Sequence, residues 1–404
     1  MKIQNEMLKA LLREAVITVR ENYRDRIVVI YHNDADGISS GYILKTALMR
    51  AGFQTEIFCL EKLYPEALKV LFQKKGVFII GDLGSAFTKL LSHNNFHHNQ
   101  IIILDHHQVL HETSDEKILL VNPEKCGYSG STDISGAGVC YLFALELDPD
   151  NYDLCPIAMV GNSELPGTFQ SLSREILNSG IMSGVIRDDE TSDEGSYEIL
   201  LPDKEWYSLP EIFKVSDTLG TIGYYQEGFN SGIELFEFGY TEALRCFYRK
   251  LDSEKNECFQ RALACIEKNG YKNGADLIWF DAKDIFAGMG NKVIGLFLSE
   301  WKKMLPENLC VYILGMMNLE KEIPGIGVIA HENKKVSGRL SERMQKMVLA
   351  DRMLPLSEIF AKAAASVGGF GDGHKVASSA VIPRNKILGF VRFSEKMIKD
   401  FEER

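Results

Sequence analysis

Short apolar runs rich in β-branched residues alternate with helical patterns over the first half of the chain. Continuous apolar runs of this length are typical of strands that are buried on both faces of a parallel sheet. Between them, the segments after Asp36 and after Tyr64 show helical periodicity and end in glycine, as helix C-caps often do. The pattern therefore predicts an open, doubly wound α/β sheet. Its five predicted strands are IVVIYH from Ile27, TEIFCL from Thr55, VFIIGD from Val77, IIILDH from Ile101 and ILLVN from Ile118.

The second half of the chain predicts a helical region followed by a second α/β unit. Residues 206–270 have helical periodicity, and further strands are predicted at DLIWF from Asp276, CVYILGM from Cys310 and GIGVIAHE from Gly325. KVSGRLSER from Lys335 predicts a strand that leads into a loop or helix, and GGFGDGHKVASSAVIP from Gly368 predicts a glycine-rich loop. We therefore expect a large α/β domain over 1–200, a helical connecting region over 201–274 and a smaller α/β domain over 275–404.

The composition is that of an ordinary globular protein. The 404 residues are 45% hydrophobic and 25% charged, which excludes disorder, fibre and coiled coil as descriptions of the whole chain. No apolar run approaches the roughly 18 to 20 residues of a membrane span, and the N-terminal residues lack a signal-peptide core, so we expect a cytoplasmic protein. The eight cysteines are scattered without a CxxC pair, which argues against a zinc ribbon or a disulfide framework.

The net charge limits how the protein can contact a nucleic acid. Subtracting 56 acidic from 45 basic residues leaves a formal charge of -11. A large, uniformly basic surface is therefore excluded, and any such contact would have to be local, in a cleft or groove.

Carboxylates and imidazoles directly follow three of the predicted strands. Because the carboxyl ends of parallel strands meet at one edge of an open sheet, we expect these side chains to lie together at that edge. Asp34 and Asp36 taken alone also suit the turn and N-cap of the following helix. His32 suits either a ligand or a merely orienting or solvated histidine. The residues in question are Asp34 and Asp36 in HNDADG, Asp82 in GDLG, and the triplet Asp105, His106 and His107.

This set of side chains indicates a site for divalent ions. Carboxylate oxygen together with neutral imidazole nitrogen suits Mn²⁺, whereas an all-oxygen set favours Mg²⁺ or Ca²⁺. A bridging aspartate can hold two ions, and two ions about 3.5 to 4 Å apart activate water and stabilise the oxygens of a phosphoryl displacement. We therefore expect the hydrolysis of a phosphate ester.

The motifs DADG, GDLG and DHH, in this order and at the ends of predicted strands, resemble those of the DHH family of phosphoesterases. Near the C-terminus, the run from Gly368 to His374 with Ala377 and Ile382-Pro383 is similar to the glycine-rich motif of the DHH-associated substrate-binding domain. This motif, with SGAGVCYLFA at 135–144 and LGTIGYY at 219–225, is most similar to archaeal RecJ-like proteins. The resemblance covers nearly the whole chain and implies a DHH domain followed by a DHH-associated domain.

The resemblance also implies roles for individual residues. Asp82 would bridge two metal ions, His107 would face the scissile phosphate, and Asp105 would orient the DHH motif. Arg339 matches a position where the family places a basic residue toward the substrate, although it also suits a solvated surface position. The family's metal ligands match Asp34, Asp36, Asp82 and His106. The opposite wall of the substrate site would be formed by Gly368, Gly369, Gly373 and His374, whose glycines otherwise suit a tight turn.

One position departs from the family pattern. Relatives carry a further metal-binding aspartate after a glycine at the end of the next strand, whereas this chain has Asn162 after Gly161. Asparagine offers the metal only a neutral carbonyl oxygen, so we expect the site to bind its second ion more weakly. Glu164 would compensate only if the loop bent toward the site.

The resemblance implies a phosphodiesterase, dependent on Mn²⁺ or Mg²⁺, that removes mononucleotides from single-stranded DNA or RNA in a groove between the two domains. It leaves the polarity and the sugar preference open. One alternative is the hydrolysis of short oligoribonucleotides or cyclic dinucleotides, which other DHH branches carry out. Another is a catalytically weakened scaffold that associates with GINS and the replicative helicase, as archaeal RecJ-like proteins can.

Overall fold

The computed structural model describes residues 5–109, 113–189, 196–273, 276–328 and 332–403 of the chain. The chain divides into two compact units, one of Met1–Arg249 with Ile323–Gly327 and one of Lys250–Glu322 with Val328–Arg404. The division falls within α10 (Glu242–Asn269), a helix of 28 residues. The three-part domain division expected from the sequence stays a prediction.

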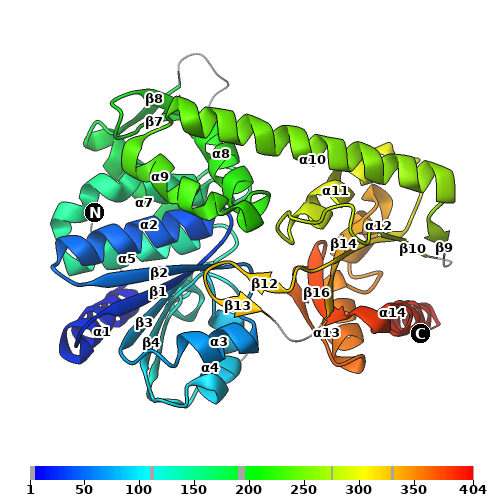
Figure 1. Ribbon diagram of the computed structural model, residues 1–404, viewed down its shortest axis with the longest axis horizontal. Coiled ribbons are helices and arrows are strands. Elements are labelled where there is room, and N and C mark those ends of the chain that lie inside the picture. The colour runs from blue at the N-terminus through cyan, green and yellow to red at the C-terminus, as the bar shows by residue number, and fades with distance from the viewer. Residues whose placement is uncertain (1–4, 110–112, 190–195, 274–275, 329–331, 404) are drawn as a thin grey trace. The chain divides into compact units, whose positions relative to one another are not determined.

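The first unit is built around a parallel sheet of five strands in the order β2-β1-β3-β4-β5 (Figure 1). Every residue of β1 and β3 is buried, as expected for strands that are covered on both faces. The predicted doubly wound α/β fold is confirmed. The strands lie where the apolar runs predicted them: β1 (Ile27–His32), β2 (Thr55–Leu60), β3 (Val77–Gly81), β4 (Gln100–Leu104) and β5 (Ile118–Val121).

Helices cover both faces of this sheet. Figure 1 shows α2 (Ala35–Arg50) and α5 (Gly136–Leu147) on one side, and α3 (Pro65–Leu71) and α4 (Thr88–Asn94) on the other. The helix α2 follows β1 directly and packs against it at Gly41, where a Cβ would lie 2.6 Å from the ring of Tyr31. The unit also contains α1 (Glu6–Asn22), α6 (Cys155–Asn162), α7 (Ser171–Met182), α8 (Leu209–Thr221) and α9 (Gly228–Phe238). A small antiparallel sheet consists of β6 (Ile186–Asp188), β7 (Tyr197–Leu200) and β8 (Trp206–Ser208).

The register of the parallel sheet sets the ends of β1, β3 and β4 side by side. Tyr31 pairs with Gly81, and Gly81 pairs with Leu104. The residues that follow these three strands therefore leave the sheet at neighbouring positions of one edge. The strand order also reverses between β1 and β3, and ligands of open α/β sheets bind outside the carboxyl ends of the strands at such a switch point.

The second unit contains a six-stranded sheet in the order β15-β16-β14-β11-β10-β9. Within it β10 and β11 pair in parallel, whereas the other neighbours pair antiparallel. Its strands are β9 (Lys272–Asn273), β10 (Leu277–Asp281), β11 (Tyr312–Asn318), β14 (Asn333–Leu340), β15 (Phe370–Gly373) and β16 (Ser378–Pro383). Its helices are α11 (Val293–Trp301), α12 (Glu342–Leu349), α13 (Leu356–Ser366) and α14 (Ile387–Glu402). Between β11 and β14 in the sequence, β12 (Glu322–Ile323) and β13 (Gly327–Val328) form a two-stranded sheet.

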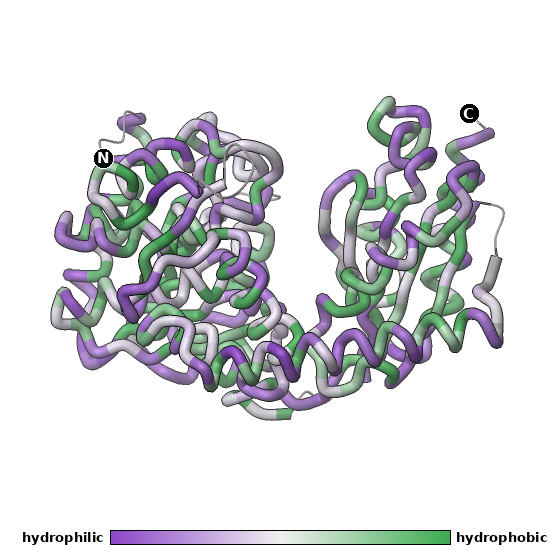
Figure 2. The backbone as a smooth tube through the Cα atoms, turned by 90° about the horizontal axis from the view of Figure 1, so that it is seen from above, coloured by the Kyte–Doolittle hydropathy of each residue, from purple (hydrophilic) through white to green (hydrophobic). Residues whose placement is uncertain are grey.

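The second unit has its own hydrophobic core. Phe360 of α13 and Phe390 of α14 pack edge to face, with ring centroids 5.4 Å apart, beside Tyr312 of β11 and Val336 of β14. Hydrophobic stretches recur along the strands and helices of both units (Figure 2). None of the helices in the described parts of the chain is both long and apolar enough to cross a membrane.

Two predictions for the C-terminal part of the chain are corrected. The segment from Gly368, predicted as a loop, forms a hairpin of β15 and β16, in which the backbone N–H of His374 donates to the carbonyl of Ala377 at 2.8 Å. Glycine favours this close pairing, because a side chain at Gly369 or Gly373 would overlap the partner strand. Within the described part of the strand predicted over 325–332, only Gly327–Val328 form a strand, β13, and residues 329–331 lie outside the described residues.

Replacing Ile103 with alanine should destabilise the first unit, since this residue of β4 is fully buried between the layers of the unit. The free energy of unfolding should fall by about 2–5 kcal/mol, the usual cost of removing a buried isoleucine side chain. Ile17→Ala on α1, where the residue is 53% exposed, should change it by less than about 0.5 kcal/mol. Urea unfolding followed by circular dichroism measures both, and equal losses would contradict this packing.

Candidate metal centre

The first carboxylate of the centre belongs to the turn between β1 and α2. Asp34 is the N-cap of α2, and its Oδ1 accepts a hydrogen bond from the backbone N–H of Gly37 at 2.9 Å. The N-cap role considered for this residue is thus correct for one of its oxygens. The other oxygen, Oδ2, lies 2.8 Å from Nδ1 of His32 at the end of β1, and both residues are buried. The structure therefore places His32 inside the cluster.

Asp36 lies in the first turn of α2 and is held by the N-terminus of α5. Its carboxylate accepts hydrogen bonds at 2.7 Å from the hydroxyl of Ser135 and from the backbone N–H groups of Gly136 and Ala137. Burial raises the pKa of Asp36 to about 7, and the negative charge of Glu164 adds to the rise although His106 opposes it. Asp36 is therefore rigidly oriented but poorly compensated in charge.

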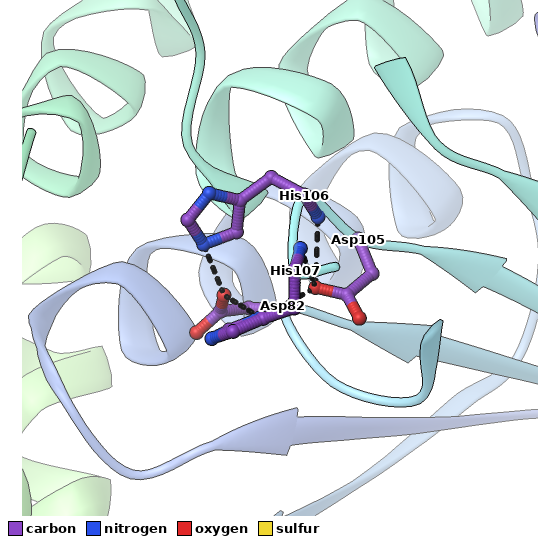
Figure 3. A group of neighbouring side chains, drawn as sticks. All are labelled: Asp82, Asp105, His106 and His107. Carbon is purple, nitrogen blue, oxygen red and sulfur yellow. Dashed lines mark hydrogen bonds and ion pairs between the residues drawn. The ribbon is translucent and has the colours of Figure 1, made fainter. Parts of the chain in front are cut away.

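Asp82 follows β3 and lies at the middle of the cluster. It has a φ of 58°, which is unusual for a residue other than glycine, and only 1% of its surface is exposed. Within the described residues, neither of its carboxylate oxygens has a hydrogen-bond donor. Oδ2 lies 3.6 Å from Nδ1 of His32, and Oδ1 lies 3.4 Å from Nε2 of His106 (Figure 3). Burial and the charges of Asp36 and Asp34 raise the pKa of Asp82 well above its usual range.

Asp105 follows β4 and positions the two histidines after it. Its Oδ1 accepts from the backbone N–H of His106 at 2.8 Å and lies 2.8 Å from Nδ1 of His107 (Figure 3). Its Oδ2 accepts from the backbone N–H of Ser85 at 2.8 Å. Burial alone would raise the pKa of Asp105, but His107 and these hydrogen bonds outweigh it and lower the pKa. The side chain of His107 is 47% exposed, so Asp105 presents it toward solvent.

His106 directs one ring nitrogen at three carboxylates. Its Nδ1 lies 2.6 Å from the carbonyl oxygen of Gly130, which can only accept, so Nδ1 carries a proton. Its Nε2 lies 3.4 Å from Asp82, 3.6 Å from Asp36 and 3.2 Å from Glu164. Burial alone would lower the pKa of His106, but the nearby carboxylates of Asp82, Glu164 and Asp36 outweigh burial and raise the pKa well above its ordinary value. This arrangement of carboxylates requires a cation, either a proton or a metal ion.

These residues fit divalent metal ions. Asp82 belongs to two groups of ligands and reaches a different histidine with each oxygen. Carboxylate oxygens and imidazole nitrogens are suitable ligands for Mn²⁺, and buried carboxylates without donors require a positive partner. The cluster can therefore hold metal at the edge where β1, β3 and β4 end. Its groups, with ligand atoms within 4.8 Å of one another, are His32, Asp34 and Asp82; Asp36, His106 and Glu164; and Asp82, Asp105, His106 and His107.

The structure corrects the surroundings expected for Asn162. The family resemblance implied a strand end at this position, but Asn162 is the last residue of the helix α6. Its Oδ1 accepts a hydrogen bond from the backbone N–H of Ser135 at 3.0 Å. Glu164, two residues after Asn162, does lie in the cluster. The sequence carries little sign of this, because the family pattern has its aspartate at the position of Asn162. The predicted metal contact of Asn162 stays a prediction.

The predicted substrate-binding residues lie in the second unit, at one end of its sheet. Gly338 pairs with Ser378, which starts β16 just after the β15–β16 turn, so Arg339 and His374 lie at the same end. His374 is exposed. The Nε of Arg339 donates to the hydroxyl of Ser299 at 3.1 Å, and burial lowers the pKa of Arg339. The contacts of these residues and of Gly368, Gly369 and Gly373 with a substrate stay predictions.

The sequence of the first unit matches a known family. Residues 26–161 match the DHH family, N-terminal domain. This stretch contains the whole metal centre except Glu164, together with the four elements that carry it, β1, α2, β3 and β4. This part of the chain therefore matches the N-terminal domain of the DHH family.

Similar proteins share the fold over nearly the whole chain. The chain is 29% identical to the uncharacterized protein MJ0831 of Methanocaldococcus jannaschii, over 93% of this chain and 94% of that one. The DHH domain of a member of a ribosomal protein family has a TM-score of 0.65 at 15% identity, over 98% and 92% of the two chains. Exonuclease RecJ bound to manganese has a TM-score of 0.63 at 16% identity, over 99% and 95%. CDC45 from Entamoeba histolytica has a TM-score of 0.56 at 11% identity, over 99% and 100%. The predicted RecJ-like fold is confirmed.

The stability of the metal-free protein should fall as the pH rises from about 4 to about 7. The folded state holds a proton on Asp36 up to a pKa of about 7, whereas the unfolded state loses it near the ordinary value of 3.8, so deprotonation favours unfolding in this window. A divalent ion replaces that proton, and at about 100 times its Kd it contributes about 2.7 kcal/mol.

Thermal unfolding with and without Mn²⁺ measures this effect. The increase in Tm caused by Mn²⁺ should be larger at about pH 8 than at about pH 5, where protons compete for the carboxylates. In Asp82→Asn the increase should be much smaller at both pH values. An increase that is independent of pH and of Asp82 would contradict the assignment of the cluster as the metal centre.

Proposed function

We propose that the protein is a phosphodiesterase of the RecJ type, dependent on Mn²⁺ or Mg²⁺, which hydrolyses single-stranded DNA or RNA to mononucleotides in the cytoplasm. The observation that carries the proposal is the position of Asp82. Its two oxygens face two separate sets of ligands, which is the arrangement that a pair of ions sharing one carboxylate requires. A pair of ions suits the displacement reactions of phosphate esters.

The residues of the chain would orient the reacting groups. When bound, the two ions would lower the pKa of water to supply a nucleophile and would stabilise charge on the phosphate oxygens. Asp105 accepts from Nδ1 of His107, which fixes the tautomer and leaves Nε2 for a phosphate oxygen or its proton. The same aspartate holds the backbone of both histidines, so it keeps His107 in place relative to His106. Asp105 would thus act as a positioning residue.

A second candidate function is a scaffold of the archaeal replication machinery, in which the protein binds GINS or the replicative helicase with weakened catalysis. The observation in its favour is Asn162, which offers no charge at a position where relatives carry an aspartate and whose Oδ1 already accepts from Ser135. The shared fold with CDC45 is compatible with this function. The other carboxylates of the motifs are present, and they favour the enzyme.

Cleavage of single-stranded oligonucleotides tests the proposal. DNA and RNA labelled at the 5′ or the 3′ end are incubated with the protein and Mn²⁺ or Mg²⁺. We expect mononucleotide products, with activity lowered more than about 100-fold in Asp82→Ala and about 10–100-fold in Asp105→Asn. Glu146→Gln is the control. It lies ten residues after Gly136 on α5, about 15 Å along the helix, in an exposed ion pair with Arg13.

Each other outcome selects a different function. Cleavage of dinucleotides or cyclic dinucleotides alone would replace the exonuclease with a phosphodiesterase of short substrates. An inactive natural protein that becomes active in Asn162→Asp would support the scaffold. Activity that survives Asp82→Ala would contradict the role of the cluster.

Arg339 and His374 would contact the phosphate backbone of the substrate. Arg339→Ala and His374→Ala should each raise KM roughly tenfold, and because the contact of a cationic side chain releases counterions, Arg339→Ala should also make KM less dependent on salt. The control is Arg392→Ala, at an exposed position of α14. Steady-state kinetics at several salt concentrations measure the effect, and a KM that is unchanged in both variants would exclude these residues from the substrate site.

A further inference from the structure

The chain leaves α6 through a tight turn beside the metal centre. The backbone N–H of Ser163 donates to Val160 at 3.2 Å, that of Glu164 to Gly161 at 3.1 Å, and that of Leu165 to Asn162 at 3.1 Å. Bonds between residues three apart tighten the end of a helix. The segment therefore continues to wind after Asn162, which keeps Glu164 close to the end of α6.

From this turn, Glu164 reaches the metal centre. Its Oε1 lies 3.2 Å from Nε2 of His106, the nitrogen that also faces Asp36 at 3.6 Å and Asp82 at 3.4 Å. A glutamate is one methylene longer than an aspartate, which increases the reach of this position. Its side chain is 30% exposed, so one part faces the buried cluster and another faces solvent.

The side chain of Asn162 makes a hydrogen bond to the N-terminus of α5. It is fully buried, its Oδ1 accepts from the backbone N–H of Ser135, and its Nδ2 lies 3.7 Å from the sulfur of Met159. It thus supports the N-terminus of α5, which in turn holds Asp36. An amide carries no charge and therefore cannot neutralise an ion.

Two further features indicate that Glu164 faces a cation. Asp82, which is 1% exposed, has no donor for either carboxylate oxygen in the described part of the chain, and it lies beside the same nitrogen of His106. Three carboxylates thus converge on one imidazole nitrogen. Without a positive ion, their repulsion would turn the partly exposed Glu164 toward water, since its side chain can leave the cluster at little cost.

We propose that Glu164 is a ligand of the metal ion held by Asp36 and His106, and that it supplies the carboxylate that Asn162 lacks. The proposal rests on the metal centre of the proposed function, but it does not depend on nuclease activity. In this proposal, the carboxylate of Glu164 compensates for the negative charge that is missing at Asn162.

Mn²⁺ binding measured by titration calorimetry and electron paramagnetic resonance tests the proposal on the full-length protein. The natural protein, Glu164→Gln, Asn162→Asp and the double variant are compared, with Glu146→Gln as the control for loss of a glutamate elsewhere on the unit. We expect two bound ions in the natural protein. In Glu164→Gln one of them should bind at least about tenfold more weakly, which corresponds to about 1.4 kcal/mol, while the other is unchanged.

The double variant should recover much of the lost affinity, because Asn162→Asp returns a carboxylate to the same side of the centre. Glu146→Gln should match the natural protein. Circular dichroism and the Tm of the metal-free variants check folding. A structural role for Glu164 would lower the Tm of the metal-free protein, whereas a ligand role should lower only the increase that Mn²⁺ produces.

The contradicting results are distinct for the two proposals. If Asp82→Ala abolishes Mn²⁺ binding but Glu164→Gln binds both ions as the natural protein does, Glu164 is no ligand and the proposed function stands. If the natural protein binds no Mn²⁺ or Mg²⁺, the metal centre and the role of Glu164 both fail. If Glu164→Gln lowers the Tm of the metal-free protein and leaves both ions bound, the residue is structural.

Discussion

Burying a carboxylate without a hydrogen-bond donor costs free energy, and the metal centre of the first unit contains one at Asp82 within the described residues. Three aspartates of the centre accept hydrogen bonds from the backbone: Asp34 from the start of α2, Asp36 from the start of α5, and Asp105 from the residues after β3 and β4. Helix N-termini suit such negative groups because their N–H groups are unpaired and their dipoles are positive. Asp82 alone lacks this support within the described residues, and it faces a histidine on each side. A cation bound to Asp82 would neutralise this buried negative charge.

Glycine allows the backbone to come this close to the carboxylates. A Cβ at Gly136, the first residue of α5, would lie 2.6 Å from Asp82, and one at Gly161 of α6 would overlap Asp36. Gly130 similarly passes so close to the carbonyl of His106 that no other residue fits. The α5 and α6 helices can therefore converge on the ends of β1, β3 and β4. The same glycines thus allow both the packing of these helices and the close grouping of the carboxylates.

The features that could be predicted from the sequence are those that follow from the local pattern of apolar and polar residues. Apolar runs placed all five parallel strands, and the aspartates directly after them identified the edge of the centre, because parallel strands bring their carboxyl ends together. The sequence could not predict what depends on packing between distant segments. Asn162 was expected at a strand end and lies at the end of a helix, and only the turn after it brings Glu164 to His106. The glycines after Gly368 similarly suggested a loop, whereas close pairing of β15 with β16 requires them.

The most direct test of the central claim is a crystal structure of the protein grown with Mn²⁺, in which anomalous scattering locates the ions. We expect two peaks about 3.5 to 4 Å apart, both within bonding distance of the carboxylate of Asp82. One peak should adjoin His32 and Asp34, and the other Asp36 and His106. A single ion, or two ions of which neither contacts Asp82, would contradict the account.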